Sequence, residues 1–357
     1  MNSGSLSLSN SEIVKIYEER FNPDEEYLGR NKQVNKIEPL VSVFITTYQH
    51  APFIRDCIDG ALMQKTSFPI EILIGEDEST DGTREICMEY AEKHPDKIRL
   101  FLRDRKTSQL YDEDGNLIMR FNHKWLRKSA RGKYIAVCEG DDYWTVENKL
   151  QKQVDFFNKN DDYILTVGGY LMCCEKSGKM KKVIRRVNKP GNEQPDGYTF
   201  NGEMASKRWI TKTLTIMYRN LEEIFNDSYI YKNARDVHFI YHLMKYGKGF
   251  YFTEVFGVYR IHDGGVYSSK SAEERVILRY NISKDLYLKN RDNNSRLMYL
   301  IAISVLLKNC NDEFYLHHKN FSKFRMFTEW FRLLRTPGEI YTFVRTTLGF
   351  LFGIKNK

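Results

Sequence analysis

Three carboxylates lie close together in the segment CEGDDYW, residues 138–144. Glu139, Asp141 and Asp142 directly follow a short apolar run. The glycine between them, Gly140, allows the chain to turn tightly. Like charges this close are costly to bury unless a cation or several hydrogen-bond donors compensate them. Mg²⁺ and Mn²⁺ prefer oxygen ligands, and Mg²⁺ is usually shared between carboxylates and substrate phosphates. The segment therefore fits either a divalent metal site or an acidic surface turn before a helix.

Two more carboxylates stand at the ends of predicted elements. Asp77 follows an apolar run, where it can accept hydrogen bonds from a nucleobase or a ribose, or can cap the next helix. Asp236 begins a helical pattern and fits an N-cap. It also fits a general base, provided that it reaches a substrate hydroxyl. On residue type alone, capping is the commoner role for both carboxylates.

Other polar side chains have the same two kinds of interpretation. Thr46 ends a strand-like run and can contact a ligand or cap the backbone. His262 lies in a glycine-rich loop and can bind a metal or a phosphate, although a single loop histidine usually does neither. Arg103, with Arg99 and Arg105, can pair with a phosphate or belong to a solvated charge cluster.

The elements that must position these residues alternate between strand and helix. Apolar runs predict strands over 41–45, 70–74 and 98–102. Between them, apolar residues at helical spacing predict helices through 53–62 and 86–91. This alternation predicts an α/β fold with a mostly parallel central sheet and helices on both faces. Ligands bind at the carboxyl ends of such strands, so Thr46, Asp77 and the acidic segment are expected to converge on one cleft.

Composition divides the chain into three parts. Residues 1–38 are polar with one helix-like patch, 39–271 carry the strand pattern, and 272–357 are mainly helical. The last part combines aromatic with basic residues, namely Phe321, Phe324, Phe327, Trp330 and Phe331 with Lys319, Lys323, Arg325, Arg332, Arg335 and Arg345. This pattern is typical of helices that lie on an anionic membrane surface. Packing against the first domain or a second subunit explains it equally well.

Length and charge allow several partners. The chain has 357 residues and a formal net charge of +8, which suits nucleotides, anionic lipid or nucleic acid. The apolar content of the C-terminal part fits a membrane surface better than nucleic acid. The six cysteines form no C-x-x-C motif, residues 1–10 form no secretory signal, and the longest apolar run, 297–307, is too short to span a bilayer. A cytoplasmic protein, peripheral at most to the inner face of the cell membrane, is expected.

Familiar nucleotide and hydrolase motifs do not occur. The sequence has no G-x-x-x-x-G-K-[ST], G-x-G-x-x-G, G-x-S-x-G or H-E-x-x-H motif. Their absence disfavours P-loop ATPases, dinucleotide enzymes, serine hydrolases and zinc proteases.

Five segments, in order along the chain, resemble the family 2 glycosyltransferases, a group of inverting, nucleotide-sugar-dependent enzymes with the GT-A fold. The segments are VSVFITTYQHAPFIRDCIDGALMQ, EILIGEDESTDGT, GKYIAVCEGDDYWTVENKLQKQ, ARDVHFIYHLMKYGKG and VYRIHDGGVYS. The resemblance covers residues 39–269 and is greatest to bacterial enzymes that build capsular, exopolysaccharide or O-antigen chains. It implies a GT-A domain followed by a helical extension.

The resemblance also implies roles for the candidate residues. Thr46 and Tyr48 would line the nucleotide pocket, and Asp77 would accept a hydrogen bond from uracil. Arg103 is a further candidate contact to the donor. The D-x-D-like site would hold Mn²⁺ or Mg²⁺ on the donor diphosphate through Asp141 and Asp142, with Glu139 alongside and His262 closing over it. Asp236 would be the catalytic base.

Two departures from the family pattern qualify these roles. Glu76 and Glu139 stand where the family often has aspartate. Asp77 is therefore the safer nucleotide contact, and Asp141 or Asp142 the safer metal ligand.

The implied reaction is transfer of a hexosyl or N-acetylhexosaminyl group from a nucleotide-sugar, with UDP expected from family frequency, to a hydroxyl of a glycan or lipid-linked acceptor. A metal stabilises the departing diphosphate and one base takes the acceptor proton, whereas a glycoside hydrolase needs two carboxylates. The alternative is a non-catalytic nucleotide-sugar-binding or assembly subunit. A sugar nucleotidyltransferase would need a glycine-rich loop after 41–45, where none occurs. The donor sugar, the acceptor and the oligomeric state stay open.

Overall fold

The computed structural model of the chain describes residues 9–22, 25–29, 37–115, 117–185, 193–223, 231, 235–265, 269–309, 314, 318 and 321–341. They fall into two compact units. The first comprises the residues up to Gly202 together with Ile210–His262, and the second comprises Glu203–Trp209 with the residues from Asp263 onward. Lys319 and Arg345, which belong to the expected amphipathic region, lie outside the described residues.

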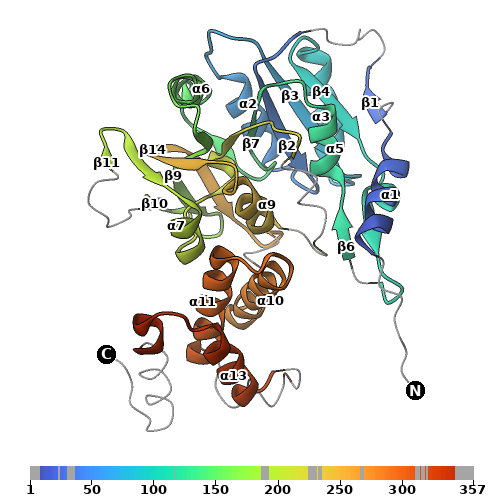
Figure 1. Ribbon diagram of the computed structural model, residues 1–357. Coiled ribbons are helices and arrows are strands. Elements are labelled where there is room, and N and C mark those ends of the chain that lie inside the picture. The colour runs from blue at the N-terminus through green and yellow to red at the C-terminus, as the bar shows by residue number, and fades with distance from the viewer. Residues whose placement is uncertain are drawn as a thin grey trace. The chain divides into compact units, whose positions relative to one another are not determined.

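A mixed sheet, with twelve strands in the described ranges, forms the centre of the first unit (Figure 1). In pairing order the strands are β1 (Glu26–Tyr27), β4 (Ile98–Leu102), β3 (Ile70–Glu76), β2 (Val41–Thr47), β7 (Tyr134–Val137), β13 (Met217–Arg219), β9 (Tyr163–Cys174), β14 (Lys248–Ile261), β12 (Gly197–Phe200) and β11 (Glu193–Gln194). Outside this order, β10 (Lys179–Val183) pairs with β9, and β8 (Tyr143–Trp144) pairs with β14. A separate two-stranded sheet joins β5 (Gln109–Tyr111) to β6 (Leu117–Arg120).

The centre of the large sheet is parallel. β2 runs parallel to both β3 and β7, and β3 runs parallel to β4. The predicted α/β fold class with a parallel centre is therefore confirmed. The antiparallel strand β13 lies between β7 and β9, and β9 in turn runs parallel to β14. This second half of the sheet joins segments far apart in the sequence.

Helices flank the sheet in the first unit, and further helices make up the second. Their bounds are α1 (Asn10–Arg20), α2 (Ile54–Leu62), α3 (Thr83–Lys93), α4 (Arg105–Ser108), α5 (Asn122–Ser129), α6 (Lys149–Lys159), α7 (Gly202–Lys207), the 3-10 helix η2 (Thr213–Thr215), α9 (Asp236–Leu243), α10 (Ala272–Asn290), α11 (Asn293–Asn309) and α13 (Lys323–Leu333).

Alternation along β2 explains why helices cover both faces of the parallel centre. Val43 and Ile45 are buried in one core cluster with residues of α2 and α3. Phe44 lies between them and points to the opposite face, since successive strand side chains alternate. There its ring contacts His123 of α5, with ring centroids 5.5 Å apart.

The second unit is helical, as predicted for the C-terminal region. Side chains of α10, α11 and α13, such as Tyr280, Ile303 and Trp330, share one buried cluster. Within the described ranges, none of the helices combines the length and the apolar character that a bilayer span requires. Phe324 of α13 is 82% exposed while Trp330 is buried, which gives this helix two unlike faces. Membrane association of the region stays a prediction.

Candidate active site at the ends of the parallel strands

The carboxyl ends of three parallel strands meet at β2. The carbonyl of Thr46 accepts a hydrogen bond of 3.0 Å from the Gly140 amide, in the turn after β7. The carbonyl of Thr47 accepts one of 3.0 Å from the Asp77 amide, directly after β3. The acidic segment and Asp77 are thus tied by backbone hydrogen bonds to adjacent residues of one strand, as the strand-end argument predicted.

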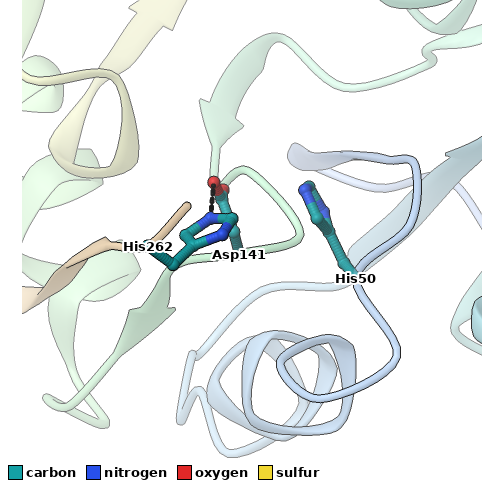
Figure 2. Close-up of side chains that lie close together, drawn as sticks. All are labelled: His50, Asp141 and His262. Carbon is teal, nitrogen blue, oxygen red and sulfur yellow. Dashed lines mark hydrogen bonds and ion pairs between the residues drawn. The ribbon is translucent and has the colours of Figure 1, made fainter. Parts of the chain in front are cut away.

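Two histidines and one carboxylate form a possible metal-binding group at this edge (Figure 2). One ligand atom from each of His50, Asp141 and His262 can be chosen so that all three lie within 4.8 Å of one another. Within this group, Oδ2 of Asp141 lies 3.1 Å from Nε2 of His262. Asp141 and His262 were predicted as metal ligands, whereas His50 was not.

Charge states in this group suit a cation. Burial would raise the pKa of Asp141, but the hydrogen bond from His262 and the nearby imidazoles outweigh it and lower the pKa. Burial lowers the pKa of His50, with Asp141 opposing the shift. At neutral pH a carboxylate anion therefore faces a neutral His50 imidazole. Divalent metals bind these protonation states of the two side chains.

The other two predicted ligands, Glu139 and Asp142, are not part of that group. Asp142 is 1% exposed, and its Oδ1 accepts a hydrogen bond of 2.9 Å from the amide of Arg260. Burial, and then the charges of Asp141 and Glu139, raise its pKa well above the usual range. Burial also raises the pKa of Glu139 to about 7. Their role as metal ligands stays a prediction.

One oxygen atom of Glu139 is suited to bind a cation. Its Oε2 is buried and accepts no hydrogen bond from the residues that the structure describes. A buried carboxylate oxygen without a donor is costly unless something else compensates it. The donor set around Asp141, with this oxygen in the same turn, therefore fits a divalent metal better than a plain surface turn.

Arg260 contacts the backbone of the acidic segment. Its NH1 donates to the carbonyl of Asp141 at 3.1 Å, and its Nε pairs with Glu175 at 3.2 Å. Its NH2 also pairs with Asp56. The guanidinium lies over the ring of Tyr143, 4.3 Å from the centroid. Arg260 therefore fixes the backbone that carries the acidic side chains.

Lys212 is a cation of the site that no sequence motif pointed to. Its Nζ lies 3.0 Å from the ring centroid of Tyr259. Its charge is the largest electrostatic influence that lowers the pKa of Glu139 and that of Asp236, in each case against burial. Burial lowers the pKa of Lys212 itself, and the carboxylates around it oppose that shift. The positive charge of Lys212 therefore partly neutralises the acidic residues of the site.

Asp236 is the first residue of α9. The N-cap of this helix is Arg235, so the prediction that Asp236 is the N-cap is wrong. Oδ1 of Asp236 accepts a hydrogen bond of 2.9 Å from the amide of the next residue, Val237. The side chain remains in contact with solvent, while the surrounding protein desolvates the carboxylate and raises its pKa, with Lys212 and Arg235 opposing. A carboxylate with a raised pKa is a stronger base when it ionises.

The predicted nucleotide contacts Asp77 and Tyr48 share a neighbour. Oδ1 of Asp77 accepts from Ser108 at 2.6 Å, and Oδ2 accepts from Gln109 and from Arg105, each at 3.1 Å. The guanidinium of Arg105 also stacks over the ring of Tyr48, 3.7 Å from the centroid. An acidic acceptor, a cation and an aromatic face are therefore in direct contact here.

Arg103, the predicted donor contact, is placed differently. It is 1% exposed and donates a hydrogen bond to Glu25. Its guanidinium also lies over the rings of Phe101 and Trp125, 4.8 Å and 5.2 Å from their centroids. This placement gives the prediction no support, and Arg105 is the arginine that contacts Asp77 and Tyr48.

Substitution of Gly140 by alanine tests how closely this turn is packed. A Cβ there would lie 2.6 Å from Oγ1 of Thr47 and 2.9 Å from Nδ1 of His50. We expect Gly140→Ala to displace His50, to weaken binding of Mn²⁺, and to lower the free energy of unfolding by about 1–3 kcal/mol. Manganese titration and chemical denaturation measure the two effects. Gly338→Ala is the matched control, because a Cβ there meets no atom within 4 Å; equal behaviour of the two variants would contradict the packing argument.

Comparison with known proteins identifies related sequences. The family model described as Glycosyl transferase family 2 matches residues 42–110. The teichuronic acid biosynthesis glycosyltransferase TuaG, as it is named in Bacillus subtilis (strain 168), is 30% identical over 181 residues, which is 50% of this chain and 62% of TuaG. An uncharacterized protein of Mycobacterium bovis is 38% identical over 122 residues, which is 34% of this chain and 32% of that protein. The chain thus spans less than two thirds of either relative.

Solved structures give weaker likenesses. S. aureus TarS 1–349 in complex with UDP-GlcNAc has a TM-score of 0.45 at 16% identity, covering 88% of this chain and 81% of that one. The mannosyltransferase PcManGT from Pyrobaculum calidifontis, in complex with GDP-Man and Mn²⁺, has a TM-score of 0.46 at 15% identity, covering 96% and 95%. At TM-scores below 0.5 these likenesses say nothing about the ligands of this chain. The sequence matches are the ones that confirm the resemblance seen in the motifs.

Proposed function

We propose that this chain, a relative of the family 2 glycosyltransferases, transfers a sugar from a nucleoside-diphosphate donor to a hydroxyl of a glycan or lipid-linked acceptor, with inversion at the sugar carbon. The observation that carries the proposal is the meeting of Asp141 and two histidines with the end of β2, which also anchors Asp77. UDP is the proposed nucleotide. The name of TuaG, which refers to teichuronic acid biosynthesis, supports a role in bacterial surface polysaccharide synthesis.

The nucleoside would bind where Tyr48, Asp77 and Arg105 are in contact. Tyr48, which is 39% exposed, offers its aromatic ring for stacking of the base. The carboxylate of Asp77 would accept from a ring N–H, and Arg105 would donate to a ring carbonyl. Thr46, half-buried at the end of β2, would line the same pocket.

The diphosphate would lie at the acidic segment. Mn²⁺ or Mg²⁺ would be held there by Asp141 and His262, with Glu139 and Asp142 as further proposed ligands, and would supply Lewis-acid stabilisation of the leaving diphosphate. The chain itself holds these carboxylates in place through Arg260 and partly neutralises them through Lys212.

Asp236 would act as the base. Its carboxylate would take the proton of the acceptor hydroxyl as that oxygen attacks the sugar carbon from the face opposite the diphosphate, which leaves with the bonding electron pair. One displacement inverts the configuration, so one base is sufficient. The raised pKa of Asp236 places its working range closer to neutral pH.

Replacement of Lys212 tests the electrostatics of this base. Lys212 and Arg235 are the cations that lower the pKa of Asp236, and desolvation by the surrounding protein raises it. Without Lys212 the pKa of Asp236 rises further, and the base must be ionised to work. We therefore expect the acid limb of the pH profile of kcat/KM to move to higher pH in Lys212→Met and to stay in place in Lys212→Arg. An unmoved acid limb in Lys212→Met would show that Lys212 does not act on the base.

A panel of nucleotide-sugars tests the proposal itself. The full chain is incubated with UDP-, GDP-, dTDP- and CMP-sugars, with Mn²⁺, with Mg²⁺ or with EDTA, and the released nucleotide is measured. We expect metal-dependent release of a nucleoside diphosphate from at least one donor. Binding of a donor without any release would favour the non-catalytic subunit, and neither binding nor release under either metal would overturn the proposal.

A further inference from the structure

We propose that His50 is a third protein ligand, which together with Asp141 and His262 lets this chain bind a divalent transition-metal ion before any nucleotide-sugar arrives. The site would prefer ions that accept imidazole nitrogen, such as Mn²⁺ or Co²⁺, over Mg²⁺. The inference deepens the proposed function by adding a ligand and a metal preference. Its test contains no nucleotide.

The three side chains come from three separate segments. His50 lies three residues beyond the end of β2, Asp141 lies in the turn after β7, and His262 directly follows β14. Figure 2 shows the carboxylate of Asp141 joined to His262 by the dashed line, with His50 beside them on its own loop. Two ligands at about 2.0–2.2 Å from one metal ion lie at most about 4.4 Å apart. The present spread of up to 4.8 Å therefore requires only a small rotation to close around an ion.

The loop that carries His50 is built to hold it in this place. Gln49, directly before it, has a left-handed backbone with φ of 55°, which is uncommon for a residue other than glycine. Side-chain hydrogen bonds stabilise that turn, because the Gln49 amide donates to Ser79 at 2.9 Å and the His50 amide donates to Thr83 at 2.8 Å. The backbone is therefore held in an uncommon conformation directly before the residue that carries this imidazole.

The ring of His50 also has an orienting partner. Oγ1 of Thr47 lies 3.2 Å from Nδ1 of His50. In the tautomer whose Nδ1–H donates this hydrogen bond to the hydroxyl, the lone pair is on Nε2, which can then bind a metal. Metal-binding histidines commonly have their other ring nitrogen fixed in this way. On the opposite side, the ring of Phe53 packs against His262, with centroids 4.7 Å apart, so both imidazoles are held.

The ligand types set the metal preference. Mg²⁺ requires oxygen ligands and keeps most of its water, so it gains little from two imidazoles. Mn²⁺ accepts both oxygen and nitrogen, and affinity for nitrogen ligands increases along the series from Mn²⁺ to Co²⁺. A site with two nitrogens and one carboxylate should therefore bind these ions without help from a diphosphate, which an aspartate-only site would need.

Metal binding by the nucleotide-free full chain tests the inference. Mn²⁺ binding is followed by electron paramagnetic resonance, and electron spin-echo modulation reports imidazole nitrogen bound to Mn²⁺. We expect nitrogen from two histidines in the wild type, and Mg²⁺ to compete weakly with Mn²⁺. In His50→Ala we expect a loss of affinity of about 10–100-fold and nitrogen from one histidine only.

Two further variants distinguish the loss of a metal ligand from a loss of folding. His50→Gln keeps a polar side chain of similar length but supplies no imidazole, so it should match His50→Ala. His94→Ala removes a histidine that stacks on Tyr90, outside the proposed group, and should leave the signal unchanged. Unchanged affinity and nitrogen coupling in both His50 variants, or no Mn²⁺ binding by the wild type without nucleotide, would overturn the inference. Either result would leave the nucleotide-sugar panel to be judged on its own outcome.

Discussion

Asp141→Asn is expected to remove most of the divalent-metal binding and to lower turnover of the nucleotide-sugar by about 10²–10³-fold. Asparagine keeps the shape of the side chain and an oxygen that can accept the hydrogen bond from His262, which spans 3.1 Å in the wild type. It lacks the negative charge, and Asp141 is the one carboxylate in the group of three possible ligands. Manganese titration and release of nucleoside diphosphate measure the two effects on the same preparation.

Asp161→Asn is the control for this substitution, because the Asp161 side chain is 98% exposed and pairs only with Arg219 at 3.5 Å among the described contacts. It should bind metal and turn over donor as the wild type does. Wild-type metal affinity in Asp141→Asn would contradict the account, and would indicate that Glu139 and Asp142 are the ligands.

Asp236→Asn is expected to lower turnover by about 10²–10⁴-fold while donor affinity stays close to that of the wild type. The amide cannot take the acceptor proton. It can still accept the 2.9 Å hydrogen bond from the amide of Val237, so α9 should keep its N-terminus. Single-turnover assays measure the chemical step, and calorimetric titration with the donor measures binding.

Asp236→Glu separates the two roles of this residue. Glutamate restores a carboxylate on a longer arm, so we expect partial recovery of turnover if the proton transfer matters. Full turnover in Asp236→Asn would show that the base lies elsewhere. Loss of donor binding in the same variant would mean that Asp236 serves the fold of the site and not the proton transfer.

The parallel half of the fold could be predicted because short stretches of sequence are enough to identify its strands. Buried parallel strands are continuous apolar runs, and β2 and β3 each begin at the predicted residue. The strand ends then had to meet, so Asp77 and Asp141 could be placed at one edge from the sequence. The place of β13 in the sheet could not be predicted, since β13 has three residues and pairs with strands more than 40 residues away.

Several site residues could not be identified from the sequence, for reasons that the structure explains. His50 follows an apolar strand in the string TTYQH, but nothing local shows that His262, more than 200 residues later, comes to lie beside it. Lys212 lies in an irregular segment without periodicity, and only tertiary packing brings its charge to the acidic residues. Arg103 and Arg105 look alike in sequence. Burial assigns Arg103 to the core beside Trp125 and leaves Arg105 to contact Asp77.

The measurement that tests the central claim most directly is the coupling between metal and donor binding. If the site around Asp141 holds a metal against a sugar diphosphate, each ligand must strengthen the binding of the other by the same factor. Calorimetric titration of the full chain with the donor found in the panel, in Mn²⁺ and in EDTA, measures that factor. We predict clearly tighter donor binding with Mn²⁺ in the wild type and no difference in Asp141→Asn. Equal donor affinity in Mn²⁺ and EDTA for the wild type would contradict the account.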